Sequence, residues 1–357
     1  MKICLSMIVK DESLCVEKCL QSVKPFISHW VIADNGSTDN TEEVCRKTLE
    51  GIPGEFVHTT WKDFSSNRNE CLELARATDC DYLLIIDADD YIEAQAGAFD
   101  NLFGSCYRIQ VQHANVVHYR PHLIHKDVPA KYVGVLHEYL ELPANVEQII
   151  LPNVKMIIGH GGNRSSDHFG KFGKDIDVLR RALIDEPKNA RYQFYLAQSY
   201  RDNGQLDEAI HHYAKRAEMI NGFREERYMS YLEVGRLTER IDEHNSDIIT
   251  RAYLDAYEVN PNRAEAPYYL AKYYRSLEQL ANSYVFAKLA CSIAKPAEAL
   301  FLEPEVYDWM RWDEAGITAY YSNDHEAGKK ACKTALACTT MPNSNIARIA
   351  KNLSFYR

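Results

Sequence analysis

The chain has 357 residues, of which 46% are apolar and 26% charged, a length sufficient for two domains with at least one large core. This composition argues against disordered and collagen-like classes, and no apolar run approaches the roughly 18 residues that a membrane-spanning helix needs. The ten cysteines include no CxxC pair, and the N-terminus lacks the pattern of a secretory signal. We therefore expect a cytoplasmic protein with reduced thiols, rather than a zinc ribbon or a disulfide scaffold.

Charge is distributed unevenly along the chain. Residues 1–170 carry 15 Lys/Arg against 24 Asp/Glu, a net charge of −9, whereas residues 171–357 carry 26 against 27, a net charge of −1. An acidic first half is a poor surface for nucleic acid, because phosphate contacts normally supply much of that affinity. It is a suitable place for a divalent cation. Since Tyr also gathers in the second half and Gly in the first, we expect two domains, 1–170 and 171–357.

The first half alternates short apolar runs with amphipathic segments, which predicts strands alternating with helices. The predicted strands are 3–9, 30–33, 55–61 and 82–87. The predicted helices are 14–23 and 65–77. Strand–helix alternation with short connections predicts an α/β domain with a mostly parallel sheet and helices on both faces.

Carboxylates stand where three of these strands end. Ligands of parallel sheets bind beyond the carboxyl ends of the strands, and Asp11, Asp34 and Asp87 lie there. Asp87 begins the run Asp-Ala-Asp-Asp, in which Asp87 and Asp89 project to the same side of an extended backbone while Asp90 faces elsewhere. Such a pair repels itself unless a cation compensates, and its oxygen ligands suit Mg²⁺ or Mn²⁺. The alternative is a solvated acidic turn.

The segment 34–42 follows the second strand and reads Asp-Asn-Gly-Ser-Thr-Asp-Asn-Thr-Glu. Its Asn-Gly pair permits a tight turn, and Asp39 with Glu42 has the spacing of a capping box. A strand-to-helix turn explains these residues but leaves Asp34 unexplained. A nucleoside would supply hydrogen-bond donors to that carboxylate.

Three further positions are candidates for chemistry. His160 ends an apolar run and is followed by Gly-Gly, so it is either a ligand or a satisfied core histidine. His137 and Glu138 form an adjacent acid/base pair after a half-apolar segment. Arg68 is a cation at the start of a predicted helix, where the alternative is an exposed helix charge.

The second half contains an internal repeat. Tyr195-Leu-Ala and Tyr200-Arg recur 74 residues later as Tyr269-Leu-Ala and Tyr274-Arg, about two units of a 34-residue repeat with small insertions. Small and large residues in the first copy fall where tetratricopeptide repeats place them. We expect an all-α helical array, with an unrelated helical bundle as the alternative. Such arrays bind protein partners or self-associate.

Four motifs, in this order, resemble family 2 glycosyltransferases of the GT-A fold. They are Met7–Glu12 (MIVKDE), Asp34–Asp39 (DNGSTD), Arg68-Asn69 and Asp87–Asp90 (DADD). The similarity is greatest to the branch that carries a C-terminal tetratricopeptide-like domain. It implies a Rossmann-like GT-A domain over 1–170, followed by a tetratricopeptide-like helical domain over 171–357.

This resemblance implies a nucleotide cleft and a metal site. The residues that would line the cleft are Ile8, Lys10, Asp11, Asp34, Asn35, Arg68, Asp87 and Ala88. Within it, Asp34 or Asn35 would meet uracil or ribose, and Arg68 would contact the diphosphate. The ligands of a Mn²⁺ or Mg²⁺ ion would be Asp87, Asp89 and His160. The branch usually has Asn at position 11, so Asp11 adds a charge beside the diphosphate.

The implied activity is inverting transfer of a sugar, expected to be a hexose, from a UDP-sugar to a protein, glycan or lipid-linked acceptor. Inverting transfer needs a base on the acceptor side, and Glu138 is the first candidate, with His137 and Asp90 as alternatives. A nucleotidyltransferase would show an early Gly-rich basic phosphate loop, which is absent from the sequence. A second alternative is a catalytically weak or inactive transferase domain on a helical interaction scaffold.

Overall fold

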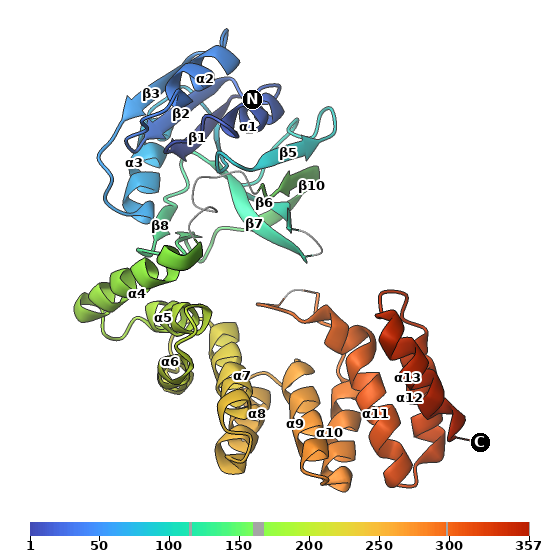
Figure 1. The fold of residues 1–357 in the computed structure, drawn as a ribbon. Coiled ribbons are helices and arrows are strands. Elements are labelled where there is room, and N and C mark those ends of the chain that lie inside the picture. Colours follow the sequence, from blue (N-terminus) through green and yellow to red (C-terminus); the bar gives the residue numbers. More distant parts are fainter. Residues whose placement is uncertain (114–115, 160–167, 298, 357) are drawn as a thin grey trace. The chain divides into compact units, whose positions relative to one another are not determined.

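The computed structural model describes residues 1–113, 116–159, 168–297 and 299–356. The chain forms two compact units, Met1–Lys174 and Asp175–Arg357, and helix α4 (His168–Asp185) runs across the division. Figure 1 shows the first unit as a sheet with attached helices and the second as an array of helices.

The first unit is built on an eight-stranded sheet with the order β3-β2-β1-β4-β7-β6-β10-β5. Its strands are β1 (Ile3–Val9), β2 (His29–Asp34), β3 (Gly54–His58), β4 (Tyr82–Ile85), β5 (Tyr91–Ala94), β6 (Cys106–His113), β7 (Val116–His125) and β10 (Gln148–Ile157). The pairs β3/β2, β2/β1, β1/β4 and β6/β10 are parallel, whereas β4/β7, β7/β6 and β10/β5 are antiparallel. A separate two-stranded sheet pairs β8 (Lys131–Val133) with β9 (Tyr139–Glu141). The predicted α/β domain with a mostly parallel sheet is confirmed.

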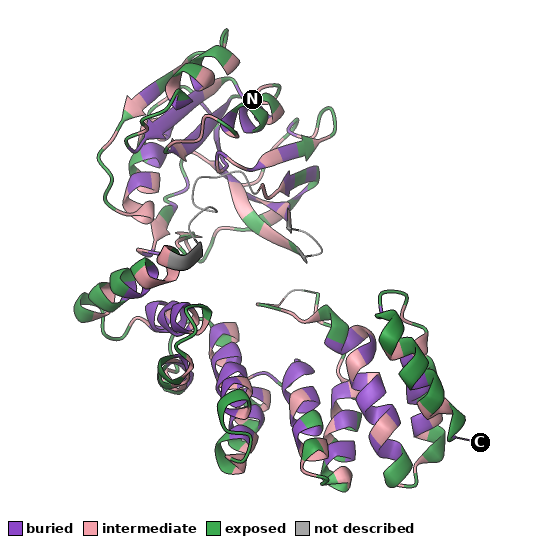
Figure 2. Ribbon diagram, in the orientation of Figure 1, coloured by how far each residue is buried: buried purple, intermediate pink, exposed green. Residues whose placement is uncertain are grey.

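The parallel half of the sheet is covered by helices on both faces. Strands β1 and β4 are almost wholly buried, as their continuous apolar sequences predict. Helices α1 (Val16–Val23) and α2 (Thr41–Thr48) pack in one apolar layer with alternate residues of β1. Helix α3 (Phe64–Arg76) packs in the layer on the other face. Figure 2 shows this buried centre of the first unit.

The predicted elements differ from the observed ones mainly at their ends. The strand expected over 55–61 ends at His58, because its partner β2 ends at Asp34, which pairs with His58. Beyond it, the Trp61 ring packs edge-on against Phe64 with centroids 4.7 Å apart. The helix expected over 14–23 begins at Val16. No elements were predicted for residues 91–157, which contribute the antiparallel strands.

The second unit is a row of helix pairs. Its helices are α5 (Ala190–Asp202), α6 (Leu206–Glu218), α7 (Arg224–Ile241), α8 (Ser246–Val259), α9 (Glu265–Ser276), α10 (Leu280–Ser292), α11 (Arg311–Tyr321), α12 (His325–Leu336) and α13 (Asn343–Ser354). A five-residue π-helix, η2 (Val306–Met310), leads into α11. Consecutive helices pack in the pairs α5/α6, α7/α8, α9/α10 and α11/α12, so the predicted tetratricopeptide-like array is confirmed. Tyr195 and Tyr269 lie in the first helices of the first and third pairs, which accounts for the 74-residue repeat.

Among the described residues, no helix combines the length and the apolar character needed to cross a lipid bilayer.

Candidate active site

The carboxyl ends of three neighbouring parallel strands place candidate residues at one edge of the sheet. Lys10 and Asp11 follow β1, Asp34 closes β2, and Asp87 follows β4. Because β2, β1 and β4 are adjacent and parallel, these residues lie at the same edge. Lys10 is exposed there, while Ile8 and Asp11 are half-buried.

Asp11 and Asp34 hold the turn that follows β2. Asp11 adopts a positive φ of 54°, its Oδ1 accepts from the Thr38 amide at 2.6 Å, and its own amide donates to Ser37 Oγ at 2.9 Å. The buried Asp34 carboxylate accepts from the Ser37 amide at 3.0 Å. Both carboxylates, predicted to line a nucleotide cleft, are therefore bonded to the 37–38 backbone, and they fix the shape of this edge.

Asn35 joins this turn to the start of α3. Its buried Oδ1 accepts from Asn67 Nδ2 at 2.8 Å and from Thr59 Oγ1 at 2.9 Å. Helix α3 begins at an N-cap, because Asp63 accepts from the Ser66 amide at 2.8 Å. The fully buried Asn67 was not predicted from sequence, and only its place beside Arg68 could have drawn attention to it.

Arg68, in the second turn of α3, brings two predicted site residues together. Its Nη2 lies 2.7 Å from Asp87 Oδ1, and its Nε donates to Glu138 Oε1 at 2.8 Å. The guanidinium also lies over the Tyr132 ring, 5.4 Å from the centroid. Burial alone would raise the pKa of the Asp87 carboxyl, but the Arg68 cation outweighs it and lowers that pKa. The Asp87 carboxylate is thus ionised while 46% of its side chain faces solvent.

A tight loop presents Glu138. Gly134 has φ +114°, and a Cβ there would lie 3.4 Å from the Glu138 Cα. His137 has φ 52° and is exposed, whereas the Glu138 side chain is only 14% exposed beside Arg68. The loop therefore turns the carboxylate inward and the imidazole outward.

The end of β10 lies against the carboxylate run. The Gly159 amide donates to Asp90 Oδ1 at 3.1 Å, and a Cβ on Gly159 would meet the Asp89 carbonyl oxygen at 1.8 Å. Burial, followed by the charge of Asp87, raises the pKa of the Asp90 carboxyl to about 7. Ala88 is buried between the acidic residues. His160, the third predicted metal ligand, lies outside the described residues.

Two residues near the carboxylates were not predicted as site residues. Burial raises the pKa of Glu12, with smaller contributions from the charges of Asp89 and Asp87, and Glu12 Oε2 accepts from Cys15 Sγ at 3.0 Å. His122 Nδ1 lies 2.9 Å from the Ile85 carbonyl oxygen, at the end of β4. Burial lowers the pKa of His122 to about 4, so the ring is neutral at pH 7. Glu12 ends the Met7–Glu12 motif but was not singled out there. His122 belongs to no motif, and the pairing of β7 with β4 places it here.

The residues present fit a divalent cation that is shared with a substrate. Among the described residues, no three His, Cys, Asp or Glu side chains are grouped as a metal site. Mg²⁺ is commonly bound by one or two carboxylates together with substrate phosphates. An ionised, partly exposed Asp87 with the half-buried Asp89 suits that mode.

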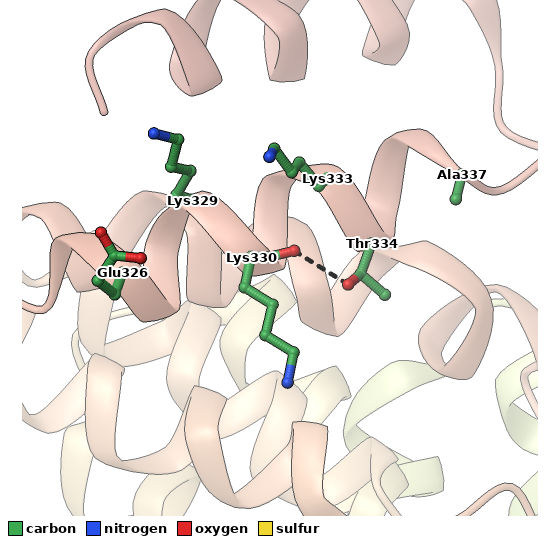
Figure 3. Close-up of a pocket in the computed structure, with 6 residues that line it drawn as sticks. All are labelled: Glu326, Lys329, Lys330, Lys333, Thr334 and Ala337. Carbon is green, nitrogen blue, oxygen red and sulfur yellow. Dashed lines mark hydrogen bonds between the residues drawn. The ribbon is translucent and has the colours of Figure 1, made fainter. Parts of the chain in front are cut away.

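Two surface hollows among the described residues lie away from this site. One of about 490 Å³ is on α12 of the second unit, lined by Glu326, Lys329, Lys330, Lys333, Thr334 and Ala337. Figure 3 shows Lys329 and Lys333 projecting to one side of the helix and Lys330 to the other. Another hollow of about 440 Å³ is lined by residues that include Met1, Tyr82 and His125, at the other end of β4 from Asp87.

Comparison with known proteins agrees with this geometry. Residues 4–99 match the family described as Glycosyl transferase family 2. The first unit therefore contains a family 2 glycosyltransferase domain, and the second unit is a tetratricopeptide-like helical domain.

Two curated relatives each carry one of these two features in their names, the repeat in one and the transferase in the other. The chain is 32% identical over 96 residues to the TPR repeat-containing protein Synpcc7942_0270 of Synechococcus elongatus, over 27% of this chain and 22% of that protein. It is 24% identical over 279 residues to the SPbeta prophage-derived glycosyltransferase SunS of Bacillus subtilis, over 73% of this chain and 64% of that protein. The chain thus spans less than two thirds of either relative.

Solved structures similar to the chain include a MamA protein, with 20% identity, a TM-score of 0.37, and coverage of 47% of this chain and 82% of that one. Another is YrrB, titled a TPR protein with an unusual peptide-binding site, with 15% identity, a TM-score of 0.38, and coverage of 52% and 85%.

Proposed function

We propose that this protein is an inverting glycosyltransferase that moves a sugar, a hexose, from a UDP-sugar to a protein, glycan or lipid-linked acceptor. The observation that supports this most is the bridge from Asp87 through Arg68 to Glu138. It brings together a carboxylate for the donor side, a cation for the leaving diphosphate and a carboxylate for the acceptor side. The family match of residues 4–99 supports the same reaction class.

On the donor side, Asp87 and Asp89 would hold Mn²⁺ or Mg²⁺, with His160 as a further ligand. The ion would act as a Lewis acid that neutralises charge on the leaving diphosphate. Arg68 supplies a second cation at the same place and would contact the diphosphate. Since the ionised Asp87 already neutralises Arg68, donor phosphates and Asp87 would compete for the guanidinium.

The nucleoside would lie at the carboxyl ends of β1 and β2, beside Ile8, Lys10 and Ala88. The oxygens of Asp11 and Asp34 are bonded to the 37–38 turn, so we infer that they shape the cleft by holding this backbone. The exposed Lys10 is placed for electrostatic attraction of a phosphate.

On the acceptor side, Glu138 would take the proton of the acceptor hydroxyl. The acceptor oxygen then bonds to the anomeric carbon, and the bond from that carbon to the diphosphate oxygen breaks, so the nucleoside diphosphate leaves. Arg68 orients the Glu138 carboxylate through the 2.8 Å hydrogen bond. His137 and Asp90 are the alternative bases.

The helical domain would bind a protein partner or a second copy of the chain, and we expect the protein to act in the cytoplasm.

Isothermal calorimetry with UDP, with and without Mn²⁺, tests the donor side. We expect Mn²⁺ to strengthen UDP binding to the wild type, but not to Asp89→Asn, which keeps the size of the side chain and removes its charge. Asp127→Asn, at an exposed position, is the matched control. UDP at 100 times its Kd should also stabilise the wild type by about 2.7 kcal/mol. Equal Mn²⁺ dependence of UDP binding in wild type and Asp89→Asn would contradict the proposal.

A second experiment, hydrolysis of a panel of nucleotide sugars by the wild type, would identify the donor.

A further inference from the structure

A short segment between α10 and η2 crosses several helices of the second unit. We call residues 300–303, Leu-Phe-Leu-Glu, the strap. It reaches Phe194 in α5, Arg236 in α7 and Tyr269 in α9, which are the first helices of three successive pairs. Figure 1 shows the chain before η2 extending back towards α7.

The strap is held by its carboxylate. Glu303 Oε1 accepts from Arg236 Nη1 at 2.9 Å, and Oε2 accepts from the Tyr269 hydroxyl at 2.5 Å. Arg236 is itself oriented by Glu233 of the same helix, 3.2 Å away. Burial raises the pKa of Glu303, against the lowering effect of Arg236. One cation and one hydroxyl from neighbouring helices thus form a receptor for a single carboxylate.

The backbone of the strap is bonded by side chains rather than by regular secondary structure. The Leu300 carbonyl accepts from Arg263 Nη1 at 3.0 Å, and the Leu300 amide donates to Glu225 Oε2 at 3.3 Å. The Glu303 amide donates to Glu265 Oε1 at 3.3 Å. Protein receptors contact the main chain of a bound peptide in this way.

The aromatic residue of the strap is the part that is bound least firmly. Phe301 stacks on Phe194 with centroids 6.4 Å apart, yet 48% of it remains exposed. Its φ of 49° is an unfavourable backbone conformation for a bulky residue. One turn further along α5, the buried Gln198 Oε1 has no hydrogen-bond partner within the described part of the chain. A longer bound segment could supply a donor there.

We propose that the face of α5, α7 and α9 covered by the strap is a binding site for an extended segment of a partner protein, and that the strap occupies it when the partner is absent. The partner segment would present an aromatic side chain against Phe194 and, two residues later, a carboxylate to Arg236 and Tyr269. This proposal concerns the helical domain and is independent of the transferase reaction.

The strap's own sequence provides the probe, a synthetic peptide of residues 299–305 (Ala-Leu-Phe-Leu-Glu-Pro-Glu). In the full chain, the double substitution Phe301→Ala and Glu303→Ala should release the strap and open the site, and we call this protein the opened variant. Glu305→Ala, at an exposed position of the same segment, is the control.

A tethered segment has an effective concentration on the order of 1 mM, so a strap that is bound for nine tenths of the time needs a Kd of about 0.1 mM or tighter. We expect the opened variant to bind the peptide with a Kd of about 0.1 mM or tighter, measured by fluorescence anisotropy. The wild type and Glu305→Ala should bind it about tenfold more weakly, because the strap competes.

Specificity comes from the carboxylate. We expect Arg236→Gln in the opened variant, or Glu303→Gln in the peptide, to weaken binding at least about tenfold, the loss of one charge-assisted hydrogen bond. Circular dichroism confirms that each variant is folded. Absence of binding to a folded opened variant, equal affinity for wild type and opened variant, or indifference to Arg236→Gln would each overturn the proposal.

Hydrogen exchange of the wild type provides a measurement that needs no variant. The Leu300 and Glu303 amides should exchange through local opening, faster than amides in the middle of α9. Exchange of these two amides only with global unfolding would show that the strap never leaves the site, and would overturn the proposal.

Discussion

Each unit of the protein contains an arginine bonded to two carboxylates, and the two clusters differ in their exposure to solvent. In the second unit, Arg263 is 1% exposed and bonds both oxygens of Glu265, which is fully buried, together with Glu225. Tyr307 donates its hydroxyl hydrogen to Glu265 as well, at 2.7 Å. Every charge there is bonded within the chain, so the cluster fixes the packing of the helices.

The cluster in the first unit has the same chemistry but is open on one side. Arg68 is bonded to Asp87 and Glu138, yet nearly half of the Asp87 side chain faces solvent. An ionised carboxylate that solvent can reach can also be reached by a cation or a substrate. Accessibility, rather than the number of ion pairs, therefore distinguishes a candidate active site from a structural cluster.

The largest effect is expected from Glu138→Gln, which keeps the side chain's shape and removes the proposed base. Sugar transfer should slow by about 100- to 10,000-fold, with UDP and Mn²⁺ binding unchanged. Steady-state turnover and calorimetry of the same samples measure the two quantities. Glu141→Gln, a nearby exposed position, is the control. Near-normal turnover of Glu138→Gln, with loss in His137→Ala or Asp90→Asn, would transfer the role of base to that residue.

In the closed cluster, Glu265→Gln should reduce stability and leave nucleotide binding intact. Breaking a buried ion pair on one side typically costs about 3–5 kcal/mol, since the other charge is left uncompensated. Urea denaturation followed by circular dichroism measures the free energy of unfolding. Glu258→Gln, an exposed position in the preceding helix, should change it by less than about 0.5 kcal/mol. A loss below about 1 kcal/mol for Glu265→Gln would show that the cluster is not structural.

A pH-dependent loss of stability is expected from His212. Gln193 Nε2 donates to His212 Nδ1 at 2.6 Å, and burial, with nearby cations, lowers the pKa of the ring to about 4. Between pH 6.5 and 4 the unfolded chain binds a proton that the folded chain does not, so the free energy of unfolding falls as pH falls in this window. At pH 5.5 the contribution is about 1.4 kcal/mol relative to pH 7.5. Urea denaturation at pH 7.5 and 5.5 gives the change in the free energy of unfolding between the two pH values. We expect this change to be smaller in His212→Asn than in the wild type by about 1.4 kcal/mol. The same change in both proteins would refute the assignment to His212.

The smallest effect is expected at the N-cap of α3, which positions Arg68. Asp63→Ala should destabilise the protein by about 1 kcal/mol, because the Ser66 amide loses its acceptor. Asp63→Asn retains a capping oxygen and should lose a few tenths of that amount. Thermal denaturation compares the two, and equal losses would exclude capping as the cause.

The fold could be predicted to the extent that local patterns determine it. Continuous apolar runs predicted β1 and β4, and the Tyr195/Tyr269 repeat predicted the helical array. The antiparallel strands over 91–157 were missed because their pairing depends on partners far apart in the chain. β5, for example, pairs with β10.

The candidate site shows the same limit. Residues next to strand ends were found because parallel strands end at a common edge. The sequence also indicated Arg68 and Glu138 separately, but their contact joins positions 70 residues apart. Asn67 and His122 belong to no motif, and tertiary contacts alone bring them to this site. Glu12 lies within the Met7–Glu12 motif, but the motif did not single it out. The separate roles of nucleotide-cleft residues stay predictions.

The contact between Gly159 and the Asp89 carbonyl makes possible a control that alters no charge. A methyl group at position 159 would overlap that oxygen, so the backbone must shift at the Asp87–Asp90 run. Gly159→Ala would thus misplace Asp89 while every ionisable group of the protein is retained. Comparing it with Asp89→Asn separates the contribution of position from that of charge, a distinction that substitutions of the carboxylates cannot make by themselves.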